Sequence, residues 1–325
     1  MAMRTIETSA LAAPPSSMWA MVLTGPRRRL QHIHVPVPLI GSRDVLVRVS
    51  VCGVCQLDRI LVDGHLPSAR YPVIPGHEVV GQVVEVGCYV QGFSAGQRVG
   101  VPRLGWACGR CQACRRSLEH LCRLARLTGV TDNGGLAEYV RADHRFCVHL
   151  PSDLPDGALA PLLCEGATAY RALRMLGEAR RIGLYGSATS TGLAADLTRL
   201  RGHEALVPQD GFVPPAAGLD AALVFSPAND LVRNALEAVV EGGIVVWVSD
   251  VPGHRASIAV PGLAEEPRVH WVAGATRSDL EDVLALVTTS PVDPAVEVFP
   301  MAVADEALSR LRTGSAAGSV VLSSP

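Results

Sequence analysis

Residues 108–122 read CGRCQACRRSLEHLC and bring four cysteines into one short segment. The arginines and the glutamate between them make this segment too polar for a hydrophobic core. Four thiolates at close spacings on a loop can surround Zn²⁺ as a tetrahedron and leave no coordination position open. The segment therefore predicts a structural zinc site, which stabilises its own lobe and takes no part in catalysis. The predicted ligands are Cys108, Cys111, Cys114 and Cys122.

Three further segments hold cysteines, a histidine and carboxylates outside this lobe. They are SVCGVCQLD at residues 50–58, PGHEVVG at residues 75–81 and PLLCEGATAYRAL at residues 161–173. Two cysteines and the histidine would leave one position of a tetrahedral zinc open to water or to a substrate oxygen. The three segments together predict a second zinc site, of the catalytic kind.

With GGLAEY at residues 134–139 and the four-cysteine segment, these motifs resemble the zinc-dependent alcohol dehydrogenases of the medium-chain dehydrogenase/reductase superfamily. The resemblance extends from about Trp19 to Leu322. It implies an enzyme with a GroES-like catalytic domain and a Rossmann-type domain. It also implies a homodimer that pairs through the strand predicted at residues 269–273.

The resemblance assigns the metal ligands. It implies that Cys55, His77 and Cys164 bind the catalytic zinc, and that Glu78 lies behind the ion as an alternative ligand. Two zinc ions per chain are therefore expected, one in each site.

Three more residues receive candidate roles. By resemblance, Asp58 orients the catalytic site and Thr168 faces the nicotinamide. Glu165 departs from the family, which has a small residue after this cysteine. Its carboxylate could act as an acid or base, or it could point into solvent or cap the helix that it begins.

Composition and charge limit the other function classes. A chain of 325 residues with 48% hydrophobic and 18% charged residues suits two domains. The net charge of -2 gives no basic surface for nucleic acid, and no apolar run reaches the roughly 20 residues of a membrane span. The start of the chain lacks the pattern of a signal peptide, so we expect a cytoplasmic protein. Nine cysteines then indicate metal or thiol chemistry rather than disulfides.

Strand and helix patterns divide the chain into two domains. Short strands with glycine and proline turns predict an all-β, barrel-type domain first, and the later alternation of strands and helices predicts a parallel sheet. The fold class is therefore α/β plus β. We expect a disordered tail at residues 1–17, a GroES-like zinc-binding catalytic domain at 18–153 and 290–325, and a truncated Rossmann-like domain at 154–289. The predicted elements include strands at 45–51, 78–86, 97–101, 181–185, 219–225, 243–248, 269–273 and 319–322, and helices at 161–176, 191–200, 229–240, 278–288 and 305–312.

The family's proton relay is missing. In the family, a hydroxyl two residues after the first cysteine and a histidine three residues further on carry the proton of the alcohol. These positions are Leu57 and Ile60, and neither side chain can carry a proton. A chain of water molecules would have to replace the usual route.

The phosphate-binding turn is also altered. It reads YGSATSTG at residues 185–192 and keeps Gly186 and Gly192 as candidate cofactor-binding residues. The middle glycine, which lets the backbone approach a pyrophosphate, is replaced by Ala188 or Thr189, depending on the register. This change predicts a weaker fit to NAD(P).

The nucleotide-binding sheet is predicted to lack its third strand. Only PQDGFVPPAAG, residues 208–218, separates the second strand from the strand at 219–225, which is too short for a crossover with its helix. Asp210 lies about where an acid binds the NAD ribose. The pair Asp210-Gly211 can equally form a simple turn.

Three functions remain open. The intact metal ligands beside an altered nucleotide-binding half favour a cofactor-independent zinc enzyme, in which Zn²⁺ polarises a carbonyl or hydroxyl of a small metabolite. Its reaction would be a cyclisation, addition, elimination or isomerisation, with Glu78, Glu165 or zinc-bound hydroxide moving the proton. The second function is an NAD(P)-dependent alcohol dehydrogenase or carbonyl reductase. The third is a non-catalytic binding protein that uses zinc for stability.

Overall fold

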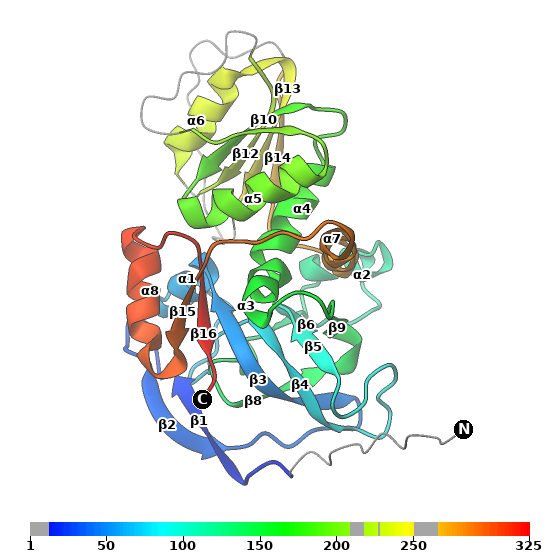
Figure 1. The fold of residues 1–325 in the computed structure, drawn as a ribbon, viewed down its shortest axis with the longest axis vertical. Helices are drawn as coiled ribbons and strands as arrows, with labels where there is room; N and C mark the ends of the chain where they lie inside the picture. The colour runs from blue at the N-terminus through cyan, green and yellow to red at the C-terminus, as the bar shows by residue number, and fades with distance from the viewer. Residues whose placement is uncertain (1–12, 209–217, 227, 250–265) are drawn as a thin grey trace, which may run out of the picture.

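The computed structural model describes residues 13–208, 218–226, 228–249 and 266–325. Two large sheets dominate these residues, and in Figure 1 the parallel sheet lies above the mixed one. Helix α4 (Glu165–Arg174) runs between them. The predicted combination of a β domain with an α/β domain is confirmed. The domain boundaries drawn from the sequence stay predictions.

The lower sheet forms around β3, which pairs with three other strands. Valines alternate along β3 and fill the core beneath it, as expected for a strand with one buried face. The order is β15-β16-β3-β4-β5-β9, with β8 also on β3. The strands are β3 (Asp44–Val54), β4 (Glu78–Val86), β5 (Arg98–Val101), β8 (Tyr139–Asp143), β9 (Val148–His149), β15 (Val296–Pro300) and β16 (Ser319–Ser323).

The upper sheet is parallel throughout and is buried on both faces. Helices α4, α5 and α7 cover one face, and α6 covers the other. Burial of both faces explains the apolar runs LDAALVF and GIVVWV in its central strands. The elements are β10 (Arg181–Gly186), β11 (Glu204–Leu206), β12 (Leu219–Phe225), β13 (Val239–Val248), β14 (Arg268–Val272), α5 (Ala188–Leu200), α6 (Asn229–Ala238) and α7 (Arg277–Thr289).

The strand order of this sheet is β11-β10-β12-β13-β14. This is the strand order of a Rossmann sheet whose one edge is the second strand. The third strand, which the sequence predicts to be missing, is not found among the described residues. Asp210 lies outside the described residues. Strand β13 begins at Val239, four positions before the predicted start, because Val239 pairs with Leu219 ahead of a register shift.

Smaller elements complete the lower domain. β1 (Ser17–Val22) and β2 (Gln31–Pro36) form a hairpin, and β6 (Leu104–Trp106) pairs with β7 (Arg126–Leu127) at the base of the four-cysteine lobe. The remaining helices are α1 (Gln56–Val62), α2 (Gln112–Arg115), η1 (Glu119–Leu121), η2 (His144–Phe146), α3 (Asp156–Leu159), η3 (Ala160–Leu163), η4 (Met301–Val303) and α8 (Ala304–Thr313). None of the helices in the described residues has the length and apolarity needed to cross a lipid bilayer.

The helix predicted at residues 161–176 is broken at Cys164. Residues up to Leu163 form η3, and α4 begins at Glu165. Cys164 itself has a φ of -134° and a ψ of -68°, which is not helical. The break lies next to a predicted zinc ligand, so the local backbone sets the position of that thiol.

Candidate functional site

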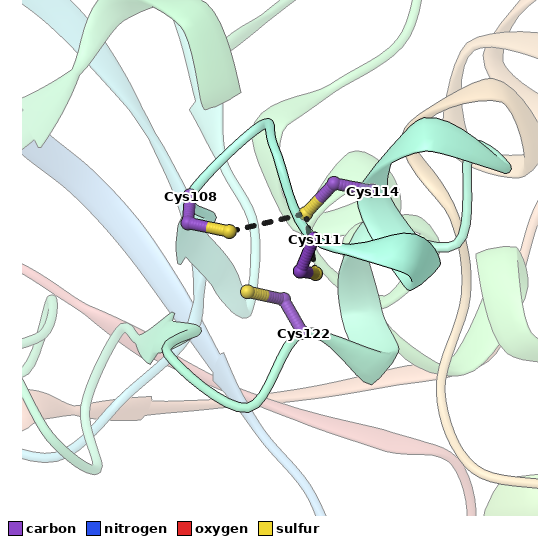
Figure 2. A group of neighbouring side chains, drawn as sticks. All are labelled: Cys108, Cys111, Cys114 and Cys122. Carbon is purple, nitrogen blue, oxygen red and sulfur yellow. Dashed lines mark hydrogen bonds between the residues drawn. The ribbon is translucent and has the colours of Figure 1, made fainter.

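The four cysteines of the lobe converge on one point (Figure 2). Cys108 Sγ lies 3.9 Å from Cys114 Sγ, and Cys111 Sγ lies 3.5 Å from the same atom. Together with Cys122, the four sulfur atoms all lie within 4.8 Å of one another. Sulfur ligands of a tetrahedral zinc with bonds of about 2.3 Å lie at similar separations. The backbone N–H groups of Arg110 and Cys111 lower the pKa of the Cys108 thiol to about 6, which favours the thiolate.

A second group consists of Cys55, His77, Glu78 and Cys164. All four residues are buried, and one donor atom of each lies within 4.8 Å of the others. His77 Nε2 lies 3.4 Å from Cys55 Sγ. The structure thus brings together four predicted metal-site residues that are far apart in the sequence.

Strand pairing brings three of these residues together. Cys55 directly follows β3, whereas His77 directly precedes β4 and Glu78 begins it. Gly53 lies opposite Glu78 in the antiparallel pair, and a Cβ at Gly53 would lie 2.0 Å from Glu78 Oε2. The glycine between the two cysteines of SVCGVC therefore leaves room for the carboxylate. The break before α4 then presents Cys164 to the same point.

Asp58 fixes the orientation of its neighbours. It accepts hydrogen bonds from the backbone N–H of Cys55 at 3.0 Å and of Gly76 at 3.2 Å. Its Oδ1 also lies 3.4 Å from Nδ1 of His77, so that Nε2 faces the thiol. This arrangement holds the imidazole as a carboxylate holds a metal-binding histidine.

The charge of the second group fits a divalent cation. A hydrogen bond with Cys164 and burial raise the pKa of the Cys55 thiol, and burial beside Cys55 raises the pKa of Glu78. Glu78 Oε1 is buried and has no hydrogen-bond partner among the described residues. A bound cation would offset the negative charge of thiolates and carboxylate together. Two thiolates and an imidazole are the ligands that zinc takes in alcohol dehydrogenases.

A cavity of 360 Å³ opens beside this group, and both domains line it. The lower domain contributes Cys55 with Leu57 and Ile60, and α4 contributes Thr168. The upper domain contributes residues at the carboxyl ends of three parallel strands, which is where such sheets bind their ligands, and one residue of the first turn of α5, Ser190. These residues are Ser187, Ser190, Phe225, Ser226, Val248 and Ser249.

Glu165 also lines this cavity. It neither points fully into solvent nor serves only as a helix cap, because Ser319 Oγ donates a hydrogen bond to its Oε2 at 3.2 Å. Burial raises the pKa of Glu165 to about 7, and the bond from Ser319 partly opposes this rise. Leu57 and Ile60 are buried apolar residues at the relay positions.

The two predicted cofactor glycines lie elsewhere. Gly186 and Gly192 line a separate depression of 550 Å³. A Cβ at Gly186 would lie 3.0 Å from the carbonyl oxygen of Phe225, so glycine is favoured by strand packing, whereas nothing surrounds a Cβ at Gly192. The residues of this turn that face the metal-binding group are Ser187 and Ser190.

Comparison with known proteins places the chain in a family. Residues 41–152 match the model of the alcohol dehydrogenase GroES-like domain, and residues 208–322 match the model of the zinc-binding dehydrogenases. A Mycobacterium tuberculosis protein named probable alcohol dehydrogenase AdhA is 36% identical over 328 residues, covering 92% of this chain and 93% of its own length. This chain belongs to the zinc-binding alcohol dehydrogenase family.

Solved structures of alcohol dehydrogenases share the whole fold. A cinnamyl alcohol dehydrogenase from Sorghum bicolor matches with a TM-score of 0.81 and 25% identity, over 94% of this chain and 97% of that one. An acetophenone reductase from Geotrichum candidum, solved in complex with NAD, gives a TM-score of 0.84 over 96% and 98% of the two chains. At 21% identity, the second match shows the shared fold alone.

These alcohol dehydrogenase relatives favour one of the three functions that the sequence left open. They support NAD(P)-dependent chemistry more than cofactor-independent chemistry, and they do not support the doubt about NAD(P) binding. Because Ser187 caps α5, the helix begins at Ala188, three residues earlier than predicted, and Ala188 and Thr189 lie in its first turn.

Sequence reasoning missed the serines and Phe225 that line the cavity in this alcohol dehydrogenase fold. Ser226 and Ser249 directly follow predicted strands, so the carboxyl-end rule for parallel sheets could have found them. Ser249 Oγ is buried and has no hydrogen-bond partner among the described residues. Its position in the cavity wall makes it a candidate to bind a ligand.

We expect about two zinc ions per chain, and two variants should separate their roles. Cys164→Ala should remove one zinc and all activity while leaving stability nearly unchanged. Cys111→Ala should remove the other zinc and lower the urea midpoint, because a closed structural site contributes folding free energy directly. Elemental analysis and urea unfolding give both readouts.

Cys88→Ala is the matched control, since Cys88 is exposed and belongs to neither cysteine group. It should retain both ions. Equal metal loss and equal destabilisation in the Cys164 and Cys111 variants would contradict the division into two kinds of site.

Proposed function

We propose that this chain is an NAD(P)-dependent zinc alcohol dehydrogenase or carbonyl reductase that acts on a small molecule. One observation carries the proposal. A single cavity is lined by Cys55 and Cys164 of the metal-binding group and by the carboxyl ends of β10, β12 and β13. A nicotinamide bound at those strand ends would lie beside the metal-binding group, which is the arrangement that hydride transfer at a polarised carbonyl requires.

The residues have separate tasks in this reaction. Cys55, His77 and Cys164 would hold the zinc, which polarises a carbonyl or hydroxyl as a Lewis acid, while Asp58 keeps the imidazole in place. The nicotinamide supplies or accepts the hydride when it is bound. Thr168 lines the cavity from α4 and would contact the nicotinamide ring.

The start of α5 favours a dinucleotide. The first N–H groups of a helix and its dipole attract phosphate, and α5 is 13 residues long. Its first turn carries hydroxyl groups, with Ser187 Oγ 2.7 Å from Thr189 Oγ1 and 3.1 Å from Ser190 Oγ. These hydroxyl groups can donate to phosphate oxygens where the family has a glycine.

We expect NADH or NADPH to bind with a micromolar dissociation constant. Ser249→Ala should weaken this binding about 2- to 10-fold, because a neutral hydrogen bond contributes about that much. Ser323→Ala, at the far end of β16, is the control. Calorimetry measures both, and deuterium from C4-labelled nucleotide should be found in the alcohol product.

Cofactor-independent zinc chemistry remains the second candidate, because the relay positions hold Leu57 and Ile60. Turnover that survives complete removal of nucleotide, without deuterium transfer, would establish this candidate and rule out the dehydrogenase.

We assign Glu165 as the proton-transfer residue. Its carboxylate lines the cavity next to Cys164, whereas Leu57 and Ile60 can carry no proton. Glu165→Gln should lower kcat about 100-fold, as is typical when a general acid or base is lost, and leave the zinc content unchanged. Ser319→Ala, which removes only the hydrogen bond to Glu165, should have a smaller effect. An unchanged kcat in Glu165→Gln would show that the proton takes another route.

We also propose a homodimer that pairs through β14. Within the described residues, β14 pairs only with β13 and its outer edge is open, with Val269 51% and Trp271 48% exposed. An exposed apolar edge strand is a template for pairing with a second copy.

Val269→Glu should convert the dimer to a monomer, because it places two like charges at the paired edges. Val303→Glu, on a distant exposed valine, should remain dimeric. Light scattering at micromolar concentration measures the mass, and a monomeric unmodified chain would contradict the proposal.

A further inference from the structure

Two tryptophans stack on neighbouring strands of the parallel sheet. Trp247 of β13 and Trp271 of β14 are register partners, and their ring centres lie 5.2 Å apart at an interplanar angle of 24°. Trp247 is buried, whereas Trp271 is 48% exposed. Within the part of the chain that the structure describes, the lining of the 360 Å³ cavity includes neither indole. An effect of either ring on a ligand in that cavity must therefore pass through other residues.

Each indole donates its N–H to the carbonyl oxygen of a serine at the end of the next strand. Trp247 Nε1 lies 2.6 Å from the carbonyl oxygen of Ser226, which follows β12. Trp271 Nε1 lies 3.1 Å from the carbonyl oxygen of Ser249, which follows β13. Both serines line the cavity. The stacked rings thus hold two residues of the cavity wall.

Strand β14 binds both backbone groups of Ser249. The Ser249 N–H donates to the carbonyl oxygen of Val272 at 3.1 Å, and the Ser249 carbonyl accepts the bond from Trp271. Ser249 Oγ is buried and has no hydrogen-bond partner among the described residues. A buried hydroxyl without a partner is unfavourable. A backbone fixed in this way therefore presents the hydroxyl to a ligand in the cavity.

The stack fixes the direction in which the Trp271 N–H points. A half-exposed side chain on an edge strand could otherwise exchange between rotamers. Contact with the buried Trp247 ring restricts this exchange, because stacked aromatic pairs are favourable beyond the apolar area that they bury. Since Trp247 is itself bonded to Ser226, the end of β12 supports the end of β13 through the two rings.

We propose that Trp271 is a positioning residue of the nucleotide site: its indole holds Ser249 so that Oγ faces the cavity and binds the nicotinamide nucleotide. Trp271 acts through Ser249 and does not touch the nucleotide itself. The effect on nucleotide affinity rests on the proposed NAD(P)-dependent function, whereas the effect on the position of Ser249 does not.

Trp271→Phe tests this role, because phenylalanine keeps a ring against Trp247 and removes the N–H donor. NADH and NADPH are titrated into the zinc-loaded protein by calorimetry. The dissociation constant of the nucleotide that binds should rise about 2- to 10-fold, as for the loss of one neutral hydrogen bond. Trp19→Phe is the matched control, since Trp19 is 39% exposed and stacks on His32 in the hairpin of the lower domain. It should bind nucleotide as the unmodified protein does.

A double variant separates positioning from a general structural effect. In the Ser249→Ala background the hydroxyl is absent, so adding Trp271→Phe should change the dissociation constant less than about twofold. The same rise in both backgrounds would show that Trp271 acts independently of the Ser249 hydroxyl and would overturn the inference.

Hydrogen exchange measures the hold on Ser249 without any nucleotide. In Trp271→Phe the Ser249 N–H should exchange about 2- to 10-fold faster, because the carbonyl of the same residue has lost its partner and the strand end opens more often. Trp19→Phe should leave this exchange unchanged. Mass spectrometry of peptides that end before and after Ser249 gives the rate.

The results distinguish failure of this inference from failure of the proposed function. Unchanged nucleotide affinity in Trp271→Phe would overturn the inference and leave the dehydrogenase intact. Faster exchange at Ser249 in a protein that binds neither NADH nor NADPH would uphold the role of Trp271 in holding Ser249 and contradict the proposed function.

Discussion

Two thiols, an imidazole and a carboxylate share one buried space, and this is unfavourable unless a cation offsets their charge. Several elements of the lower domain position these four groups. Strand β3 ends just before Cys55 and β4 begins just after His77, and Gly53 makes room for Glu78. Asp58 then ties the start of α1 to the loop before β4 through two backbone hydrogen bonds. The lower sheet and α1 thus position these donor groups around one buried site.

The fourth donor connects this point to the other domain. Cys164 is held by the break between η3 and α4, and α4 packs against the parallel sheet with α5 and α7. A cavity of 360 Å³ and another of 230 Å³ are therefore separated by a single turn of backbone, because Cys164 and Thr168 line both. A rotation of the upper sheet relative to the lower one would move Cys164 before it moved the other three donor residues.

The sequence predicted much of this structure and missed parts of it for physical reasons. The resemblance to the alcohol dehydrogenases singled out Cys55, His77 and Cys164, which are distant in the chain, because the motifs around them are specific. Apolar runs located the buried strands, and β4 and β12 were predicted at their observed ends.

The start of α5 was misplaced because a serine cap leaves little trace in hydrophobic periodicity. The cavity serines are common surface residues, and only the sheet order shows which of them gather at one edge. The residues that line the 230 Å³ cavity beside Cys164 come from separated segments, so their grouping depends on the tertiary fold.

The four-cysteine lobe does more than fold on its own. Cys122 and its neighbours His120 and Arg123 form one wall of the 230 Å³ cavity that Cys164 also lines. The shape of that wall is set by the thiols that draw the lobe together (Figure 2). Loss of a metal ion from the lobe would then change the shape of a cavity beside Cys164 that this ion does not touch.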